Sequence, residues 1–323
     1  MFEDAKAKFL VYAGIFLAFI GVMGNALEIE PVHNLFYIFA WWAYIFIIDA
    51  VIYRIKGDSL IVSRTDEFWF LAVWSVFIWF IFELVNLRLQ NWQYMFMPSD
   101  RTLRWTGYFL AYASVLPGLF ETAELLAAAG LAKNAGSRSL RVTPALLINI
   151  QITGAAALLL PLVLPGYFFA LIWVAFTLLL EPLNYRLGLR SLLRDLEGGN
   201  PRKLYQLLAG GFICGLLWEF WNFKAGAKWI YTVPLAGDIK LFEMPVAGYL
   251  GFPLFAVECY AMYNFISYLR RGRTWEQDSQ DPIPGLKPAP WVLLGAAIIL
   301  LITCYAAATA IDAHTIRLYI AYL

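Results

Sequence analysis

Long apolar stretches, separated by short polar segments, follow one another along almost the whole chain of 323 residues. Each stretch is close to the length of about 17–25 residues that an α-helix needs to cross a bilayer. They fall at 9–27, 35–53, 68–86, 106–128, 144–163, 166–182, 205–223, 245–269 and 290–312. The pattern predicts an all-α, polytopic transmembrane bundle of about nine helices.

Composition supports a membrane protein. Of all residues, 61% are hydrophobic and 15% are charged, and the mean hydropathy is +0.65. A soluble domain holds about 25% charged residues, so this much apolar surface needs lipid as its solvent. The partners that this composition favours are membrane lipid or a lipid-soluble substrate, and the sequence does not define an oligomeric state.

Several classes of site lack the residues that they need. A formal net charge of +1 argues against a nucleic-acid partner. The two histidines are far apart, and the three cysteines stand in separate apolar runs, so we expect no metal site and no cofactor. The chain has no phosphate-binding loop, dinucleotide fingerprint or nucleophile elbow, which leaves phosphoryl transfer and hydrolysis by familiar routes without support.

The distribution of positive charge predicts an orientation. If the first helix is retained and begins in the cytoplasm, 17 of the 24 Lys and Arg residues fall on the cytoplasmic side. Cytoplasmic loops of membrane proteins carry such an excess. We therefore expect a multi-pass integral membrane protein whose N-terminus is cytoplasmic and whose C-terminus lies on the opposite side.

Residues from the second to the fourth predicted helix recur later in the chain, in the same order. At an offset of 132 the pairs are Trp41 with Trp173, Ala43 with Ala175, Asp49 with Glu181, Tyr53 with Tyr185, and Arg54 with Arg186. At an offset of 136 they are Glu83 with Glu219, Asn86 with Asn222, Pro98 with Pro234, and Pro117 with Pro253. Ordered matches of this kind indicate an internal duplication.

The repeat predicts a division of the chain into three parts. The first four-helix repeat is 1–141, the second is 142–270, and 271–323 holds a connector, the ninth helix and an interfacial tail. Because four is an even number, both repeats insert with the same orientation, and a shared cavity is expected between them.

Five glutamates lie within or at the ends of predicted spans and are candidate catalytic residues: Glu83, Glu121, Glu124, Glu219 and Glu258. A charged side chain at the centre of a membrane helix costs about 2.5–3.5 kcal/mol on insertion scales, so such residues are usually functional. The alternative is that some of them extend to the interface or share a proton. Asp49 and Glu181, near the ends of their helices, are expected to be interfacial anchors.

Each repeat also carries a candidate binding group behind its first glutamate. Asn86 and Asn222 stand three residues after Glu83 and Glu219, on the same helix face. A Trp-x-Tyr pattern follows in the next loop, Trp92 with Tyr94 and Trp229 with Tyr231. These six residues are candidates for substrate binding, although the aromatic ones are also typical of an interfacial belt.

Part of the second repeat resembles a known family. The segments are Trp218-Glu219-Phe-Trp-Asn222, Gly226-Ala-Lys-Trp229-Ile-Tyr231, Leu241-Phe-Glu243-Met-Pro245 and Phe252-Pro253-Leu-Phe-Ala-Val-Glu258. They resemble the membrane lycopene cyclase domain and the related carotenoid hydratase-like proteins. The resemblance implies acidic functional positions at Glu219 and Glu258, with counterparts at Glu83 and Glu121. The family has two adjacent glutamates where this chain has Val257-Glu258-Cys259.

Three functions remain open from the sequence. An enzyme acting on an isoprenoid or similar lipid would use Glu258 as the proton donor, with Glu219 and Glu83 as bases or cation stabilisers. A proton-coupled or cation transporter with two pseudo-symmetric halves would use the same carboxylates to carry protons or bind its substrate. A non-catalytic membrane scaffold would use the aromatic faces for packing.

Overall fold

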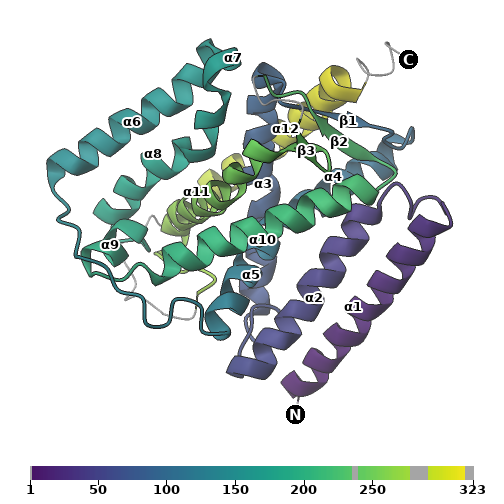
Figure 1. Ribbon diagram of the computed structural model, residues 1–323, viewed down its shortest axis with the longest axis horizontal. Coiled ribbons are helices and arrows are strands. Elements are labelled where there is room, and N and C mark those ends of the chain that lie inside the picture. The colour runs from purple at the N-terminus through teal and green to yellow at the C-terminus, as the bar shows by residue number, and fades with distance from the viewer. Residues whose placement is uncertain (1, 235–238, 277–289, 317–323) are drawn as a thin grey trace.

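The computed structural model describes residues 2–234, 239–276 and 290–316, and these are mostly helical with very little sheet (Figure 1). Nine helical segments among them are long and apolar enough to cross a bilayer. They are Phe2–Ala26, Phe36–Lys56, Thr65–Leu89, Arg101–Ala128, Pro144–Val163, Pro165–Arg186, Arg202–Lys224, Val246–Arg270 and Ala297–Ile316. The prediction of an all-α polytopic bundle of about nine helices is confirmed.

The elements follow in a simple order. The helices are α1 (Phe2–Ala26), α2 (Phe36–Lys56), α3 (Thr65–Leu89), α4 (Arg101–Ala113), α5 (Val115–Ala128), α6 (Pro144–Val163), α7 (Pro165–Phe168), α8 (Ile172–Arg186), α9 (Leu192–Glu197), α10 (Arg202–Lys224), α11 (Gly251–Ile266) and α12 (Pro290–Ile311). The 3-10 segments are η1 (Phe169–Leu171), η2 (Val246–Leu250) and η3 (Ser267–Arg270), and the strands are β1 (Trp92–Met95), β2 (Lys228–Tyr231), β3 (Lys240–Leu241) and β4 (Met244–Pro245).

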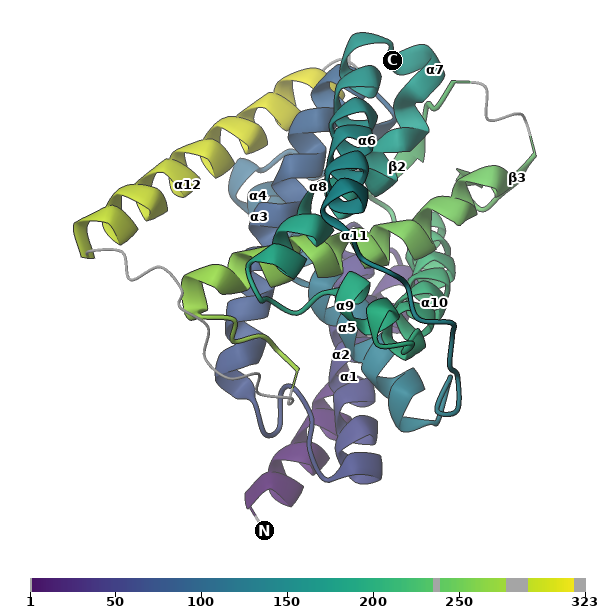
Figure 2. The same ribbon diagram turned by 90° about the vertical axis from the view of Figure 1, so that its left-hand side faces the viewer.

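Successive spans run in alternating directions, so their ends form two faces of the molecule (Figure 2). We call the face at which α1 begins the N-face and the opposite one the C-face. The helix α12 ends at the C-face, where a short π-helical segment, Asp312–Ile316, continues it. Residues 277–289 of the predicted connector and 317–323 of the predicted interfacial tail lie outside the described residues.

The fourth span is broken at Ser114, where the sequence predicted one helix over 106–128. Pro117 has no backbone N–H, so the carbonyl four residues before it cannot be paired within the helix. Ser75 of α3 lies at the break, where its hydroxyl accepts a backbone N–H of α5 at 3.0 Å and donates to the carbonyl of Tyr112. A side chain of a neighbouring helix thus satisfies backbone groups that lipid cannot.

The two Trp-x-Tyr segments, predicted to be loops, form a two-stranded antiparallel ribbon at the C-face. The strand β1 pairs with β2 so that Trp92 lies opposite Tyr231 and Tyr94 lies opposite Trp229. Each tryptophan of one segment therefore faces the tyrosine of the other, as expected if a twofold axis passes through the middle of the ribbon. Pairing satisfies the backbone of both segments where they cover the bundle.

Matched carboxylates fasten two loops at the N-face. Asp49 of α2 accepts hydrogen bonds from the hydroxyl of Ser59 at 2.8 Å and from a backbone N–H two residues further at 2.6 Å. Glu181 of α8 accepts from the hydroxyl of Ser191 at 2.8 Å and again from the N–H two residues further, at 3.3 Å. Both carboxylates are buried, and their role is to hold the loop that follows their own helix.

The helices α10 and α11 cross at close range because glycines of α10 line their contact. In Figure 1, α10 runs between the α1–α2 pair and the α6–α8 pair, and it packs on α11. A Cβ on Gly211 would lie 2.6 Å from the carbonyl oxygen of Phe252 in α11, and Gly215 faces the ring of the same residue. Small residues let membrane helices approach closely, and dispersion contacts then hold them together.

A short segment after η3 enters the N-face end of the bundle. Trp275 is 1% exposed. Its indole stacks on Phe120 of α5 with ring centroids 5.0 Å apart and an angle of 13°, and the ammonium of Lys203 lies 5.2 Å from its ring. Arg64 donates to its carbonyl oxygen. The segment thereby joins α5 of the first half of the chain to α10 of the second.

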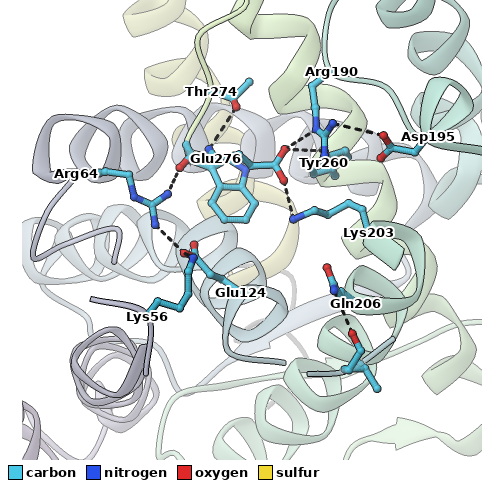
Figure 3. Close-up of polar contacts among 12 residues, drawn as sticks. Lys56, Arg64, Glu124, Arg190, Asp195, Lys203, Gln206, Tyr260, Thr274 and Glu276 are labelled. Atoms are coloured by element: carbon cyan, nitrogen blue, oxygen red, sulfur yellow. Dashed lines mark hydrogen bonds and ion pairs between the residues drawn. The ribbon is translucent and has the colours of Figure 1, made fainter. Parts of the chain in front are cut away.

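The neighbouring Glu276 lies in a cluster of cations from the second half (Figure 3). Its carboxylate is 2.6 Å from Lys203, 3.1 Å from Arg190 and 2.8 Å from the hydroxyl of Tyr260. Burial alone would raise the pKa of Glu276, but the two cations, Lys203 first, hold that pKa at about 2. We call Trp275 and Glu276 the N-face clamp.

We expect Trp275→Ala to lower the stability of the folded protein markedly. Replacing a buried tryptophan by alanine typically costs about 3–5 kcal/mol, because the cavity left behind is only partly refilled. Thermal unfolding in detergent micelles measures the effect. Trp291→Ala, which removes an indole that is 75% exposed, is the matched control and should leave the melting temperature unchanged. Equal melting temperatures for the two variants would contradict the clamp.

The contribution of Glu276 to the stability of the folded protein should depend on pH. Its folded pKa of about 2 lies below the ordinary value of 4.5, so the ionised form stabilises the fold at neutral pH, and this stabilisation is lost between pH 4.5 and 2. Glu276→Gln should therefore melt well below the wild type at pH 7, and the difference should shrink below pH 4.5. Glu28→Gln, at an exposed position, is the control. A difference that does not vary with pH would rule out the ionic explanation.

Candidate functional site

A cavity of about 430 Å³ lies between the two halves, beneath the β1–β2 ribbon. Its volume is in the range of ligand sites, about 300–1,000 Å³. Five tryptophans line it, namely Trp79, Trp92, Trp173, Trp218 and Trp229. Five tyrosines line it as well, namely Tyr37, Tyr94, Tyr108, Tyr112 and Tyr231. The wall is therefore a box of aromatic rings with a few hydroxyl and indole N–H groups.

Both strands of the ribbon contribute residues to the cavity lining. Trp92 and Tyr94 of β1 line it, and so do Lys228, Trp229 and Tyr231 of β2. The residues between the paired aromatic residues do not line it, as the period of two along a strand leads one to expect. Tyr94 and Tyr231 are diagonal neighbours in the register, and such neighbours lie about 7–8 Å apart. One ligand can thus contact both hydroxyls.

Both predicted asparagines hold the ribbon and stand outside the cavity lining. The side chain of Asn86 donates to the carbonyl of Trp92 at 2.9 Å and accepts the N–H of Asn91 at 2.8 Å. The side chain of Asn222 donates to the carbonyl of Trp229 at 2.9 Å and accepts the N–H of the same residue at 3.0 Å. Each asparagine fixes the start of its strand and so positions the aromatic residues that follow.

Glu83 lies directly behind the aromatic wall and is 1% exposed. Four hydrogen bonds converge on its Oε1 atom. The donors are the indole of Trp79 at 2.8 Å, the indole of Trp92 at 3.3 Å, the hydroxyl of Tyr112 at 3.4 Å, and the hydroxyl of Tyr94. The Tyr94 and Tyr112 hydroxyls are 3.2 Å apart. Side chains of α3, β1 and α4 thus meet at one carboxylate oxygen.

Glu219 occupies the related position in the second half and is 0% exposed. The hydroxyl of Tyr231 donates to its Oε1 at 2.6 Å. The indole of Trp229 donates in turn to the Tyr231 oxygen at 2.9 Å. The tyrosine hydroxyl therefore stands between the cavity and the carboxyl group, as Tyr94 does for Glu83.

The two carboxyl groups differ in how well a negative charge is held. Hydrogen bonds donated to a carboxylate favour its ionised form, whereas burial without donors favours the protonated form. Glu83 receives four donors and Glu219 a smaller set. Glu83 therefore holds a negative charge better than Glu219 does.

The remaining predicted catalytic glutamates lie away from the cavity lining. Glu258 of α11 is fully buried and accepts the backbone N–H of Phe176 in α8 at 2.6 Å. Glu121 of α5 is fully buried against Asp49. Two carboxyl groups in contact need a proton between them. Glu83 and Glu219 do not line the cavity but accept hydrogen bonds from residues that do, whereas Glu258 accepts its hydrogen bond from Phe176, which does not line it.

Glu124 belongs to an ion cluster at the N-face (Figure 3). Its carboxylate is 2.5 Å from Lys56 and 2.7 Å from Arg64. Arg64 also donates to the carbonyl of Trp275, so this cluster continues into the clamp. Its contacts give Glu124 a structural role, in which it joins α5 to the end of α2 and to the loop between α2 and α3.

Several residues of the site were not singled out from the sequence. Trp79 stands four residues before Glu83, on the same helix face, and this spacing is a usable signal. Trp218 precedes Glu219 directly, and Trp173 matches Trp41 at the offset of 132. Tyr112 of α4 meets Glu83 through the tertiary fold, and no sequence pattern indicates that contact.

In the part of the chain that the structure describes, no group of three or more His, Cys, Asp or Glu side chains is placed to hold a metal ion. Comparisons with models of known protein families, with curated proteins and with solved structures give no match to this chain.

Proposed function

We propose that this protein binds an apolar molecule dissolved in the membrane, of the isoprenoid or polyene class, and carries out acid–base chemistry on it in the aromatic cavity. The observation that carries this proposal is the pair of buried Tyr–Glu units, Tyr94 with Glu83 and Tyr231 with Glu219, behind one aromatic wall. The resemblance of the second half to the lycopene cyclase domain points in the same direction.

The lining suits an unsaturated hydrocarbon. Ten tryptophan and tyrosine side chains surround the cavity, and few charged groups reach it. Aromatic faces attract positive charge, so they stabilise a carbocation that forms when a double bond is protonated. A site with little water also protects such a cation from side reactions.

The difference between the two carboxyl groups assigns their roles. Protonated Glu219 is the acid, and it acts through the hydroxyl of Tyr231. Ionised Glu83 is the base, and it acts through the hydroxyl of Tyr94. General acid and base catalysis of this kind contributes about 10²–10⁴-fold each. This assignment replaces Glu258, the acid that the sequence favoured, because Glu258 contacts backbone of α8 and not the cavity.

The reaction needs no oxidant or reductant. First, the hydroxyl proton of Tyr231 passes to a carbon of the ligand, whose π electrons form the new C–H bond, and Glu219 returns a proton to the Tyr231 oxygen. The resulting cation shifts its position or is attacked by the π electrons of a second double bond, which form a C–C bond. Last, the Tyr94 oxygen takes a proton from the ligand while its own proton moves to Glu83, and the C–H electrons form a double bond. The product is an isomer of the substrate; solvent then returns a proton to Glu219 and takes one from Glu83.

We further infer the orientation and the origin of the fold. The excess of Lys and Arg on the N-face side supports a cytoplasmic N-face and a C-face on the opposite side. The matched contacts of Asn86 with those of Asn222, and of Asp49 with those of Glu181, support duplication of a four-helix unit, with halves at 1–141 and 142–270.

A second candidate is a transporter, and one observation favours it. The cavity lies toward the C-face, while Trp275 and Glu276 close the N-face. Transport would require the clamp to open so that the ligand passes between the halves. Uptake into liposomes that depends on Glu219 would favour transport, and conversion without net movement would favour the enzyme.

We expect the wild-type protein, produced in a host that accumulates a linear polyene, to convert part of it to an isomer of equal mass. Chromatography and mass spectrometry of the lipid extract measure the conversion. Glu219→Gln and Glu83→Gln should each reduce it at least 100-fold, because a proton donor or acceptor is lost. Tyr231→Phe should reduce it as well, since the hydroxyl is part of the relay.

The matched control is Glu28→Gln, which removes an exposed carboxylate on the same side and should convert polyene like the wild type. Thermal unfolding verifies that the site variants remain folded. An unchanged lipid profile with folded wild-type protein in the membrane would overturn the proposed chemistry.

A further inference from the structure

The cavity has one rim that is exposed, and this rim lies on the side of the molecule. Among its lining residues, the exposed ones are Ala170, Ala247, Leu250 and Leu254. Leu250 is 73% exposed and Leu254 is 40% exposed. They belong to η1 on one side and to η2 and the start of α11 on the other. The opening thus lies between two segments of the second half.

Short 3-10 segments flank this opening on both sides. The sixth span begins as α7 and η1 before it becomes α8, and the eighth begins as η2 before it becomes α11. Pro165 and Pro245 stand at the start of the two spans. Residues of both η1 and η2 line the cavity, so these two segments form part of its boundary.

The surroundings of the opening are apolar. No Asp, Glu, Lys or Arg occurs within 163–173 or within 244–257. Exposed side chains beside the rim include Tyr167 at 77%, Val246 at 51% and Leu164 at 46%. In a helix bundle that spans a bilayer, an exposed surface of this kind faces acyl chains. Water would not hydrate such a rim, but lipid would cover it.

We infer that the opening between η1 and η2 is a lateral portal through which the ligand passes between the cavity and the acyl chains of the C-face leaflet. The inference rests on the proposed binding of a membrane-dissolved ligand and adds its route. Figure 2 shows α7, next to η1, near the C-face end of the bundle. A ligand larger than the cavity of about 430 Å³ would leave the rest of its chain in the bilayer through the same portal.

The portal also sets the substrate class more narrowly. A molecule that enters along this route has a flexible apolar chain that can bend from the bilayer plane into the cavity. The reacting end reaches the ribbon, where Tyr94 and Tyr231 stand, while the remainder follows the apolar rim. The ligand is therefore an elongated isoprenoid lipid and not a compact polar molecule.

The test uses tritiated all-trans-retinol as an isoprenoid probe and the full chain in liposomes. Ala170→Phe and Ala247→Phe narrow the portal from its two sides. A barrier on the route slows uptake and release alike, so both rates should fall at least tenfold, whereas a mere loss of affinity would make release faster. Ala156→Phe, an equally exposed alanine on α6 outside the cavity lining, should keep wild-type rates.

Each outcome decides between the proposals. Slower uptake together with slower release supports the portal, and slower uptake with faster release overturns it. Wild-type rates in both portal variants, with retinol bound, overturn the portal and leave the proposed binding intact. Absence of retinol binding to the folded wild type overturns both. Slowed exchange without any isomer in the polyene host keeps the portal and rejects the proposed reaction.

Discussion

Carboxyl groups that are removed from water need hydrogen-bond donors from the protein, and this requirement organises the site. Glu83 and Glu219 lie where neither water nor lipid can solvate them, so indole and hydroxyl groups must do so. Those groups come from the ribbon strands and from the spans around it, and the ribbon is in turn fixed by Asn86 and Asn222. Supplying hydrogen-bond donors to two buried carboxyl groups therefore specifies the aromatic wall of the cavity.

Buried carboxyl groups at the N-face also need partners from the protein, but there the partners are cations. Glu124 and Glu276 are paired directly with cations, Glu124 with those of the first half and Glu276 with those of the second. The donors of Glu83 and Glu219, by contrast, are tyrosine and tryptophan side chains of the cavity wall. The type of donor, more than depth in the membrane, distinguishes the ion-paired carboxylates from those to which we assign a function.

The spans were predictable because their length and apolarity follow from the bilayer itself. Glu83, Glu219 and the Trp-x-Tyr residues were predictable because polar and aromatic groups recur at matched spacings. The faces of α5 and α11 were not, since these helices are apolar on every side and no periodicity shows which way Glu121 or Glu258 points. The clamp was missed because Trp275 meets its partners, Phe120 and Lys203, only through the tertiary fold. The ribbon was missed because four residues are too few to show alternation.

One difference between the halves distinguishes the surroundings of the two carboxyl groups. At the offset of 136, Tyr112 corresponds to Gly248. In the first half, the Tyr112 ring fills this position and its hydroxyl donates to Glu83. In the second half the position has no side chain, and a Cβ there would collide with the sulfur of Met244, which occupies the space. Glu219 therefore lacks the donor that Glu83 receives from Tyr112, and the different roles that we propose for the two carboxyl groups depend on this difference.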